Sequence, residues 1–229
     1  MIDFIRHQST FDPTAFAGRR VDVIGCGATG SKVVLSLAKL GVEVIHVWDF
    51  DKVEPHNIAN QAFGNDDIGK FKTEALAELV RRQTGTELVL HNERVNGTRE
   101  LGAVVFLLTD TMSSRREIWN NGIKFKQRTK VMIETRMGPE SGFVYTINPC
   151  KPTEAEAWQG TLRSDDVVQV SACGTSISVG PTAGFLAELA VWQFMRWFAI
   201  DQGKEDDELD HEIMFGMRKP GMWIRRFDD

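Results

Sequence analysis

The feature that most limits how this chain can fold is a run of glycines between a strand-like and a helix-like segment. Arg20 to Ile24 is a β-branched run that stops at Gly25. Ser31 to Leu40 carries its apolar residues on one helical face, and Val42 to Val47 again favours a strand. The sequence therefore predicts a βαβ unit with a glycine-rich turn after its first strand.

The turn reads Gly25-Cys26-Gly27-Ala28-Thr29-Gly30, which fits the pattern G-x-G-x-x-G. Glycines there let the backbone turn tightly and approach a phosphate, which then binds at the helix N-terminus. The alternative is that the glycines serve only the close packing of strand and helix. A strand before the turn and a helix after it favour the nucleotide site.

The rest of the chain continues the alternation of strands and helices. Ala103 to Leu108 is a continuous apolar run, typical of a central parallel strand covered on both faces. Phe143 to Ile147 alternates and is interpreted as a turn into a second sheet, whereas Lys151 to Gln169 has no clear period and is interpreted as a surface loop. We also expect helices at 67–83, 113–120 and 181–200, strands at 87–91 and 130–134, and a hairpin at 214–226.

This alternation predicts the fold class. It indicates an α/β protein with a Rossmann-like, open, mostly parallel sheet, helices on both faces and a small antiparallel C-terminal part. With 229 residues, of which 42% are hydrophobic, a single domain is expected. We divide it into a nucleotide-binding half (1–150), a crossover-like loop (151–172), and a long helix with a C-terminal hairpin (173–229).

Charge and hydropathy exclude several classes of partner. The net charge of −5 argues against a nucleic-acid partner held by bulk charge. The most apolar stretch, Pro181 to Ile200, is interrupted by Glu188 and Arg196, so it favours a buried helix over a membrane span. We expect its Trp192 and Trp197 in the core or in a subunit interface. Three cysteines cannot all pair with one another and the N-terminus is no signal peptide, so a reduced, cytoplasmic setting is expected.

Charged residues follow two of the expected strands. Asp49 lies 19 residues after Gly30, where a carboxylate can bind the ribose of NAD or of ATP. Asp51 either binds the ribose together with Asp49 or caps the loop. Lys72 can neutralise phosphate charge, and Asp110, at the end of the apolar strand, can hold Mg²⁺. These last two groups suit nucleotidyl transfer rather than hydride transfer.

Five motifs occur in a fixed order along the chain. They are RVDVIGCGATGS, VWDFDKVEPHNIANQ, DIGKFKTEAL, LLTDTMSSR and SACGTSISVGPTAGFLAEL. Taken together they resemble the ThiF/MoeB adenylyltransferases, whose core is shared with ubiquitin-activating enzymes. The resemblance runs from about Arg6 to Trp197.

The resemblance implies an ATP- and Mg-dependent enzyme. Such an enzyme activates the C-terminal carboxylate of a small ubiquitin-like or sulfur-carrier protein, or of a peptide, as an acyl-adenylate. The resemblance assigns Lys72 to catalysis, Asp110 to Mg²⁺, and Arg6 to the partner's site in a homodimer. The other implied nucleotide-binding positions are Gly25, Gly27, Ala28, Gly30, Asp49, Asp51, Asn57 and Asn60.

The chain departs from the family at three places. Asn60 stands where the family has an arginine, and an asparagine cannot give charge to a pyrophosphate leaving group. Either another cation, such as Lys70 or Arg115, replaces it, or activity is lowered or lost. Ala28 replaces a usual glycine, which is a mild change. The family's paired C-x-x-C ligands are missing, so no zinc site is implied.

Two of the cysteines and one histidine keep two interpretations each. Cys173, just before the long helix, is either a thioester-forming nucleophile or a small buried residue. Cys26 is expected to serve packing, and Cys150 stays open between redox or thioester use and neither. His56 either contacts a phosphate or stabilises its loop.

Three functions remain open from the sequence. The first is the adenylyltransferase that the resemblance implies. The second is a catalytically impaired scaffold or partner subunit that keeps the fold and binds nucleotide. This hypothesis rests on Asn60, which replaces the family's arginine. The third is an NAD-binding oxidoreductase, which leaves Lys72 and Asp110 unexplained.

Overall fold

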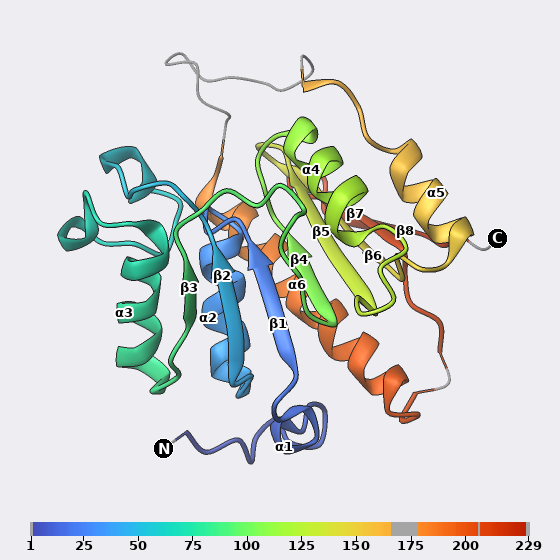
Figure 1. Cartoon of the computed structure of the whole chain (residues 1–229), viewed down its shortest axis with the longest axis horizontal. Coiled ribbons are helices and arrows are strands. Elements are labelled where there is room, and N and C mark those ends of the chain that lie inside the picture. Colours follow the sequence, from blue (N-terminus) through green and yellow to red (C-terminus); the bar gives the residue numbers. More distant parts are fainter. Residues whose placement is uncertain (1, 166–177, 206, 228–229) are drawn as a thin grey trace.

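The computed structural model describes residues 2–165, 178–205 and 207–227, and Figure 1 shows the course of the chain. Its described residues form one eight-stranded sheet in the order β3-β2-β1-β4-β5-β6-β7-β8. The strands are β1 (Arg20–Ile24), β2 (Val44–Trp48), β3 (Val89–His91), β4 (Val104–Leu107), β5 (Val131–Met137), β6 (Ser141–Ile147), β7 (Glu212–Gly216) and β8 (Gly221–Arg225). The first five are parallel, and each later strand runs antiparallel to its neighbour.

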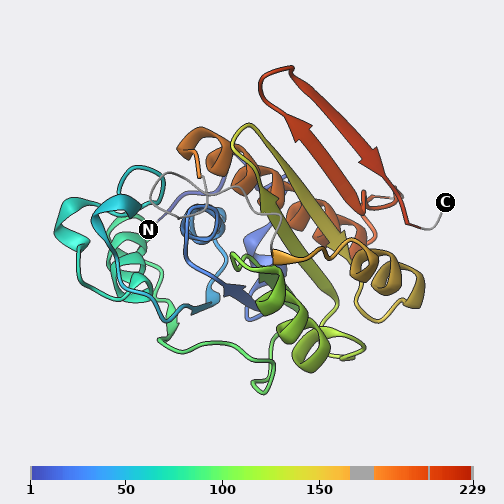
Figure 2. The ribbon, with the colours of Figure 1, turned by 90° about the horizontal axis from the view of Figure 1, so that it is seen from above.

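Helices cover both faces of the sheet. They are α1 (Pro13–Phe16), α2 (Gly30–Leu40), α3 (Lys72–Thr84), α4 (Met112–Ile118), α5 (Pro152–Gly160) and α6 (Gly180–Asp201), with short turns η1 (Pro55–Asn57), η2 (Asn65–Asp67) and η3 (Trp119–Ile123). Figure 2 shows α2 and α6 on one side of the sheet and α4 and α5 on the other. Each side has its own apolar core cluster. The predicted fold class is confirmed.

The predicted βαβ unit forms as expected. β1 pairs in parallel with β2, with Val23 opposite Val47. α2 buries Val33, Val34 and Leu37 fully against the sheet, because these positions share one helical face. Gly41 ends the helix in the left-handed conformation at φ +92°.

Three sequence-based boundaries are wrong. The helix expected from residue 67 begins at Lys72, because η2 and the left-handed Gly69 (φ +90°) occupy the segment before it. The helix expected at 113–120 is α4, which continues as the π-helical turn η3. The strand expected at 130–134 runs on to Met137, because β6 pairs with it as far as that residue.

Two further expectations are corrected by the sheet and by α5. Phe143 to Ile147 does not lead into a second sheet, since β6 pairs antiparallel with β5 in the same sheet. Residues 152–160 form helix α5 rather than a surface loop. The helical period was hidden because the buried face of α5 contains a charged residue, Glu154, next to Ala155 and Trp158.

The C-terminal part consists of α6 and the β7–β8 hairpin. The hairpin was expected from Met214, but β7 begins at Glu212. Trp197 of α6 is buried, whereas Trp192 is 50% exposed, so the two tryptophans differ in role. In the part of the chain that is described, we find no helix whose length and hydropathy would let it cross a bilayer.

Candidate functional site

The glycine turn lies where the connections of the sheet change direction. β1 has β2 on one side and β4 on the other, and all three strands end at the same edge, which is the upper edge in Figure 1. Open α/β sheets bind ligands at such a switch point, outside the carboxyl ends of the strands. The predicted site residues that follow these strands are therefore brought to one edge.

Two glycines of the turn are required by its geometry. Gly25 has φ +98°, and a Cβ there would lie 2.6 Å from the carbonyl oxygen of Leu108 at the end of β4. A Cβ on Gly30 would lie 1.8 Å from the carbonyl oxygen of Gly25. By contrast, a Cβ on Gly27 would have no atom within 4 Å among the described residues. Gly25 and Gly30 thus close the turn, and Gly27 leaves room above it.

The turn offers unused hydrogen-bond donors. Within the described residues, the backbone N–H groups of Gly27, Ala28 and Thr29 have no acceptor. They lie just before the first turn of α2, where the helix dipole also favours negative charge. Successive free N–H groups at a helix N-terminus form an anion site, so the turn fits a phosphate.

Asp49 follows β2 and holds the turn in place. Its carboxylate accepts a hydrogen bond from the N–H of Cys26 at 2.7 Å and another from the N–H of Asp51 at 2.9 Å. Burial raises the pKa of Asp49 above its ordinary value, although Lys72 and these two N–H groups oppose the shift. Each carboxylate oxygen keeps a further lone pair, which a ribose hydroxyl can use.

Asp51 and Lys72 form an ion pair beside Asp49. The ammonium nitrogen of Lys72 lies 2.8 Å from Oδ2 of Asp51. The Lys72 side chain is 9% exposed, whereas that of Asp51 is 51% exposed. The pair therefore opens to solvent on the aspartate side, where an incoming phosphate can compete for the ammonium group.

Asn57 and His56 shape the loop after β2. Oδ1 of the buried Asn57 accepts a hydrogen bond from the N–H of Glu54 and so fixes the turn η1. The exposed His56 lies 3.5 Å from a carboxylate oxygen of Glu54. Both contacts are local, which supports the loop-stabilising interpretation of His56.

Asp110 lies just beyond β4 at the same edge. It is exposed, and the described residues give it no ion pair within bonding distance. The hydroxyl of the neighbouring Thr109 is buried without a hydrogen-bond partner there. One free carboxylate beside a phosphate site fits Mg²⁺, which takes few protein ligands and shares phosphate oxygens. The described residues contain no group of three side chains that could hold a metal alone.

Neither cation suggested as a replacement for the missing arginine is free. Lys70 pairs with Asp67 at 3.2 Å and with Glu78 at 2.6 Å. The guanidinium of Arg115 is buried and lies 2.9 Å from Glu134. Burial lowers the pKa of Arg115, and the negative charge of Glu134 opposes this shift.

A different lysine reaches the residue that replaces the arginine. The ammonium group of Lys32, in the first turn of α2, donates hydrogen bonds to the carbonyl oxygens of Asn60 and, at 3.3 Å, of Ala28. Our sequence reasoning missed it. The signal was available, because a cation in the first turn of a helix opposes the helix dipole.

Four other predicted residues supply no group to the ligand-facing side of this edge, or lie outside the described residues. Arg6 lies in an exposed turn at the opposite edge, where the neighbouring Phe4 approaches Gly41, so it does not reach its own chain's site. Cys26 is fully buried, and burial raises its pKa well above the ordinary value, so it serves packing. Cys173 lies outside the described residues, and Cys150 is a half-buried free thiol.

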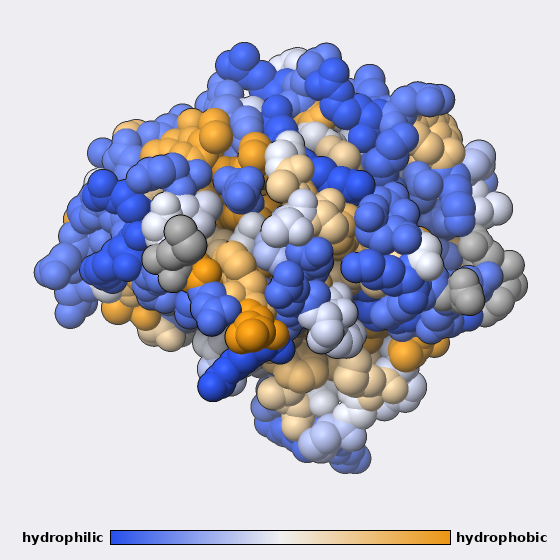
Figure 3. Space-filling model, turned by 90° about the horizontal axis from the view of Figure 1, so that it is seen from below, coloured by the Kyte–Doolittle hydropathy of each residue, from blue (hydrophilic) through white to orange (hydrophobic). Residues whose placement is uncertain are grey.

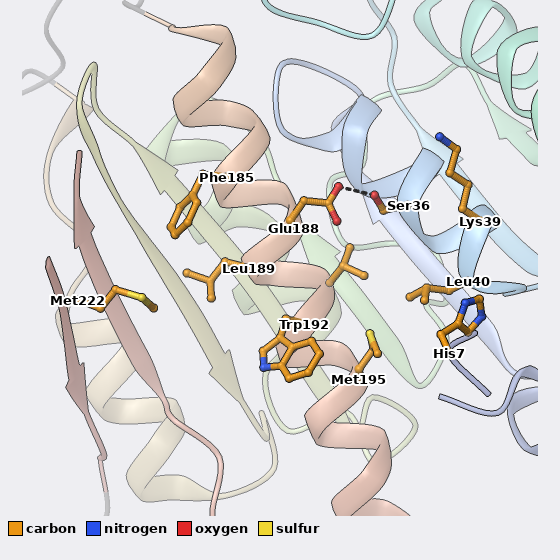
Figure 4. A pocket seen from close by; sticks show the side chains of 11 residues that line it. His7, Ser36, Lys39, Leu40, Phe185, Glu188, Leu189, Trp192, Met195 and Met222 are labelled. Carbon is orange, nitrogen blue, oxygen red and sulfur yellow. Dashed lines mark hydrogen bonds between the residues drawn. The ribbon is translucent and has the colours of Figure 1, made fainter. Parts of the chain in front are cut away.

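An apolar groove lies away from the glycine turn. It runs between α6, the C-terminal half of α2 and β8, and Figure 4 shows its side chains. Ser36 of α2 donates a hydrogen bond to Glu188 of α6 at 2.6 Å across its wall. Hydrophobic residues also reach the lower surface of the molecule in separate patches (Figure 3). The described lining of the groove is mainly apolar, in contrast to the charged edge around the turn.

Fold and site together define a Rossmann-like α/β protein whose glycine turn, with free backbone N–H groups, lies at the switch point of the sheet. The family model described as the ThiF family matches residues 15–215. The chain therefore belongs to the ThiF family, which confirms the resemblance seen in its motifs.

Curated relatives match short stretches. The uncharacterized protein y4oA of Sinorhizobium fredii is 39% identical over 67 residues, which are 29% of this chain and 11% of that protein. The adenylyltransferase and sulfurtransferase MOCS3 of Caenorhabditis briggsae is 28% identical over 81 residues, 34% of this chain and 20% of that protein. The matched part of this chain thus spans about a tenth to a fifth of these relatives.

Solved structures match nearly the whole chain at low identity. Escherichia coli MccB has a TM-score of 0.74 at 17% identity, covering 97% of this chain and 67% of that chain. PaaA has a TM-score of 0.69 at 17% identity, covering 92% of this chain and 64% of that chain. MccB has also been solved with AMPCPP and MccA, at a TM-score of 0.68 and 15% identity, with 94% of this chain and 65% of that chain covered. These likenesses show the shared fold.

Proposed function

We propose that the protein is an ATP-dependent adenylyltransferase that activates a C-terminal carboxylate. The observation that carries the proposal is the meeting of a glycine turn with free N–H groups, the Asp51–Lys72 pair and the exposed Asp110 at one edge of the sheet. Family membership supports it, because MOCS3 is named an adenylyltransferase and MccB has been solved with ATP.

Each residue has a defined task in this reaction. The free N–H groups of Gly27, Ala28 and Thr29 bind a phosphate, and Asp49 orients the ribose. Lys72 leaves Asp51 for the phosphates and neutralises charge as the substrate carboxylate attacks the α-phosphorus. Asp110 would hold Mg²⁺, which when bound would supply further positive charge beside the phosphates.

We propose a peptide or small carrier protein as the acceptor. MccB has been solved together with MccA, and MOCS3 is named a sulfurtransferase as well as an adenylyltransferase. A ubiquitin-like or sulfur-carrier protein and a short peptide share the group that this chemistry requires, a free C-terminal carboxylate. We place the reaction in the cytoplasm, where ATP is available and the thiols stay reduced.

We propose that two copies of the chain associate through the groove beside α6. Phe185 and Trp192 of α6 and Met222 of β8 line it and are 39% to 50% exposed (Figure 4). Exposed aromatic residues and methionines are enriched in protein interfaces. Trp192→Glu is expected to shift the mass measured by light scattering from dimer to monomer, and a monomeric unaltered protein would contradict this proposal.

ATP–pyrophosphate exchange tests the proposed activity. We expect labelled pyrophosphate to enter ATP when the protein, Mg²⁺ and a panel of Gly-ended carriers or peptides are present. The alternative of an impaired scaffold predicts ATP binding without exchange, and then Asn60→Arg, which restores the family arginine, is expected to restore it. Binding of NADH but not of ATP would contradict both.

A further inference from the structure

A lysine beside the glycine turn has no carboxylate partner among the described residues. Lys32 is half-buried, and its ammonium group donates to the carbonyl oxygens of Ala28 and Asn60. An ammonium group has three N–H donors, so one donor has no acceptor in the part of the chain that the structure describes. Burial lowers the pKa of Lys32 from its ordinary value.

Lys32 differs from the other cations near the site in the groups that its ammonium group contacts. Lys72 faces Asp51, Lys70 faces Asp67 and Glu78, and Arg115 faces Glu134. Each of these positive charges is balanced by a carboxylate, whereas Lys32 contacts two neutral carbonyl groups. A cation removed partly from water is costly without a counterion, and the described residues supply none to Lys32, so we argue that an anion completes the site.

The place of Lys32 in the fold indicates where this anion lies. Lys32 is the third residue of α2, and its side chain folds back over the turn to reach Ala28. Its positive charge therefore lies beside the positive end of the helix dipole and the three free N–H groups of the turn, and all of these attract an anion. The same ammonium group also donates to the backbone carbonyl oxygen of Asn60, the position of the family's missing arginine.

We propose that Lys32 binds the terminal phosphates of ATP and supplies the positive charge that Asn60 lacks. This inference rests on the proposed function, because it concerns the same site. In the reaction, a carboxylate oxygen forms a bond to the α-phosphorus, and the bond from that phosphorus to its bridging oxygen breaks. The electron pair leaves with pyrophosphate, while Lys32 stays protonated and stabilises the negative charge.

The test compares ligands that differ only in their terminal phosphates. Dissociation constants of ATP and AMP are measured by titration calorimetry with Mg²⁺ for the unaltered protein and for Lys32→Gln. The glutamine keeps a polar side chain that can still donate to the neighbouring carbonyl groups, so the turn is expected to fold. Lys126→Gln, which changes an exposed lysine outside the glycine turn and the groove, is the matched control.

We expect Lys32→Gln to weaken ATP binding about tenfold to a hundredfold, the usual effect of a lost charge-assisted hydrogen bond. AMP binding is expected to change less than about threefold, because AMP lacks the terminal phosphates. Asn60→Arg placed in the Lys32→Gln protein is expected to recover ATP affinity. Lys32→Arg, which keeps the charge, is expected to bind ATP nearly as well as the unaltered protein.

Several outcomes would overturn the inference. Equal losses for ATP and AMP would show that Lys32 only supports the turn, and unchanged ATP binding would show that it contacts no phosphate. A loss in Lys32→Arg as large as in Lys32→Gln would exclude charge as the cause. If the unaltered protein binds neither nucleotide, the proposed function fails too, whereas ATP binding that ignores Lys32 contradicts this inference alone.

Discussion

The Asp49 carboxylate accepts a hydrogen bond from the backbone N–H of Cys26 at 2.7 Å and thereby joins the end of β2 to the turn that follows β1. Its other oxygen accepts the N–H of Asp51. One side chain thus sets both the shape of the glycine turn and the start of the loop that carries the Asp51–Lys72 pair. This arrangement makes the structural and ligand-binding roles of Asp49 separable by experiment.

Asp49→Asn is expected to lower stability although it changes the shape of the side chain little. Two backbone N–H groups face the carboxylate, and an amide offers an acceptor to only one of them. The NH₂ group then faces the other N–H, which costs about 1–3 kcal/mol for an unsatisfied buried donor. Urea denaturation of the two proteins measures this difference, and Asp66→Asn, at an exposed site away from the turn, serves as the control.

Gly30→Ala and Gly27→Ala are expected to act in different ways. A Cβ on Gly30 overlaps the carbonyl group of Gly25, so this variant is destabilised by about 3 kcal/mol or more, or does not fold. A Cβ on Gly27 has open space, so Gly27→Ala is expected to keep its stability and to lose ATP affinity, because the methyl group occupies the room above the turn. Thermal unfolding and calorimetry separate the two effects. A Gly27→Ala protein with normal ATP affinity would place the phosphate elsewhere.

Lys72→Met is expected to lower the rate of pyrophosphate exchange about a hundredfold or more, as for the loss of one preorganised charge in an active site. The methionine keeps the buried length of the side chain but removes its charge. Arg81→Met, at an exposed position near the end of α3, is the matched control and is expected to keep the full rate. Similar rates for both variants would remove Lys72 from the reaction.

Glu154 is expected to make stability depend on acid pH. Burial raises the pKa of Glu154, but hydrogen bonds from His211, Lys151 and the N–H of Asn148 outweigh it and lower the pKa below the ordinary value. Because the folded pKa is lower than the unfolded one, the contribution to stability is complete above about pH 4.5 and is lost as pH falls through the folded pKa. Melting temperatures measured from pH 6 to pH 3 are expected to fall less steeply for Glu154→Gln than for the unaltered protein.

Much of the fold could be predicted because it depends on local patterns. The β-branched run of β1, the glycine turn and the apolar face of α2 lie within about twenty residues, and their order fixes a βαβ unit. The antiparallel pairing of β6 with β5 could not be read, because both a second sheet and an added strand fit the same alternation. Helix α5 was missed because its buried Glu154 looks like a surface residue until His211 is placed beside it.

The sequence by itself determined the family, the sheet with its phosphate turn, and the identity of the residues near that turn. Only the tertiary structure decided which of their charges are free. Lys72 meets Asp51 across 21 positions of sequence, and Lys32 meets Asn60 across 28. Periodicity reports which face of a helix or strand is buried, but the pairing of polar groups depends on where distant loops converge. For that reason the cation that faces the missing arginine's position emerged from the folded chain.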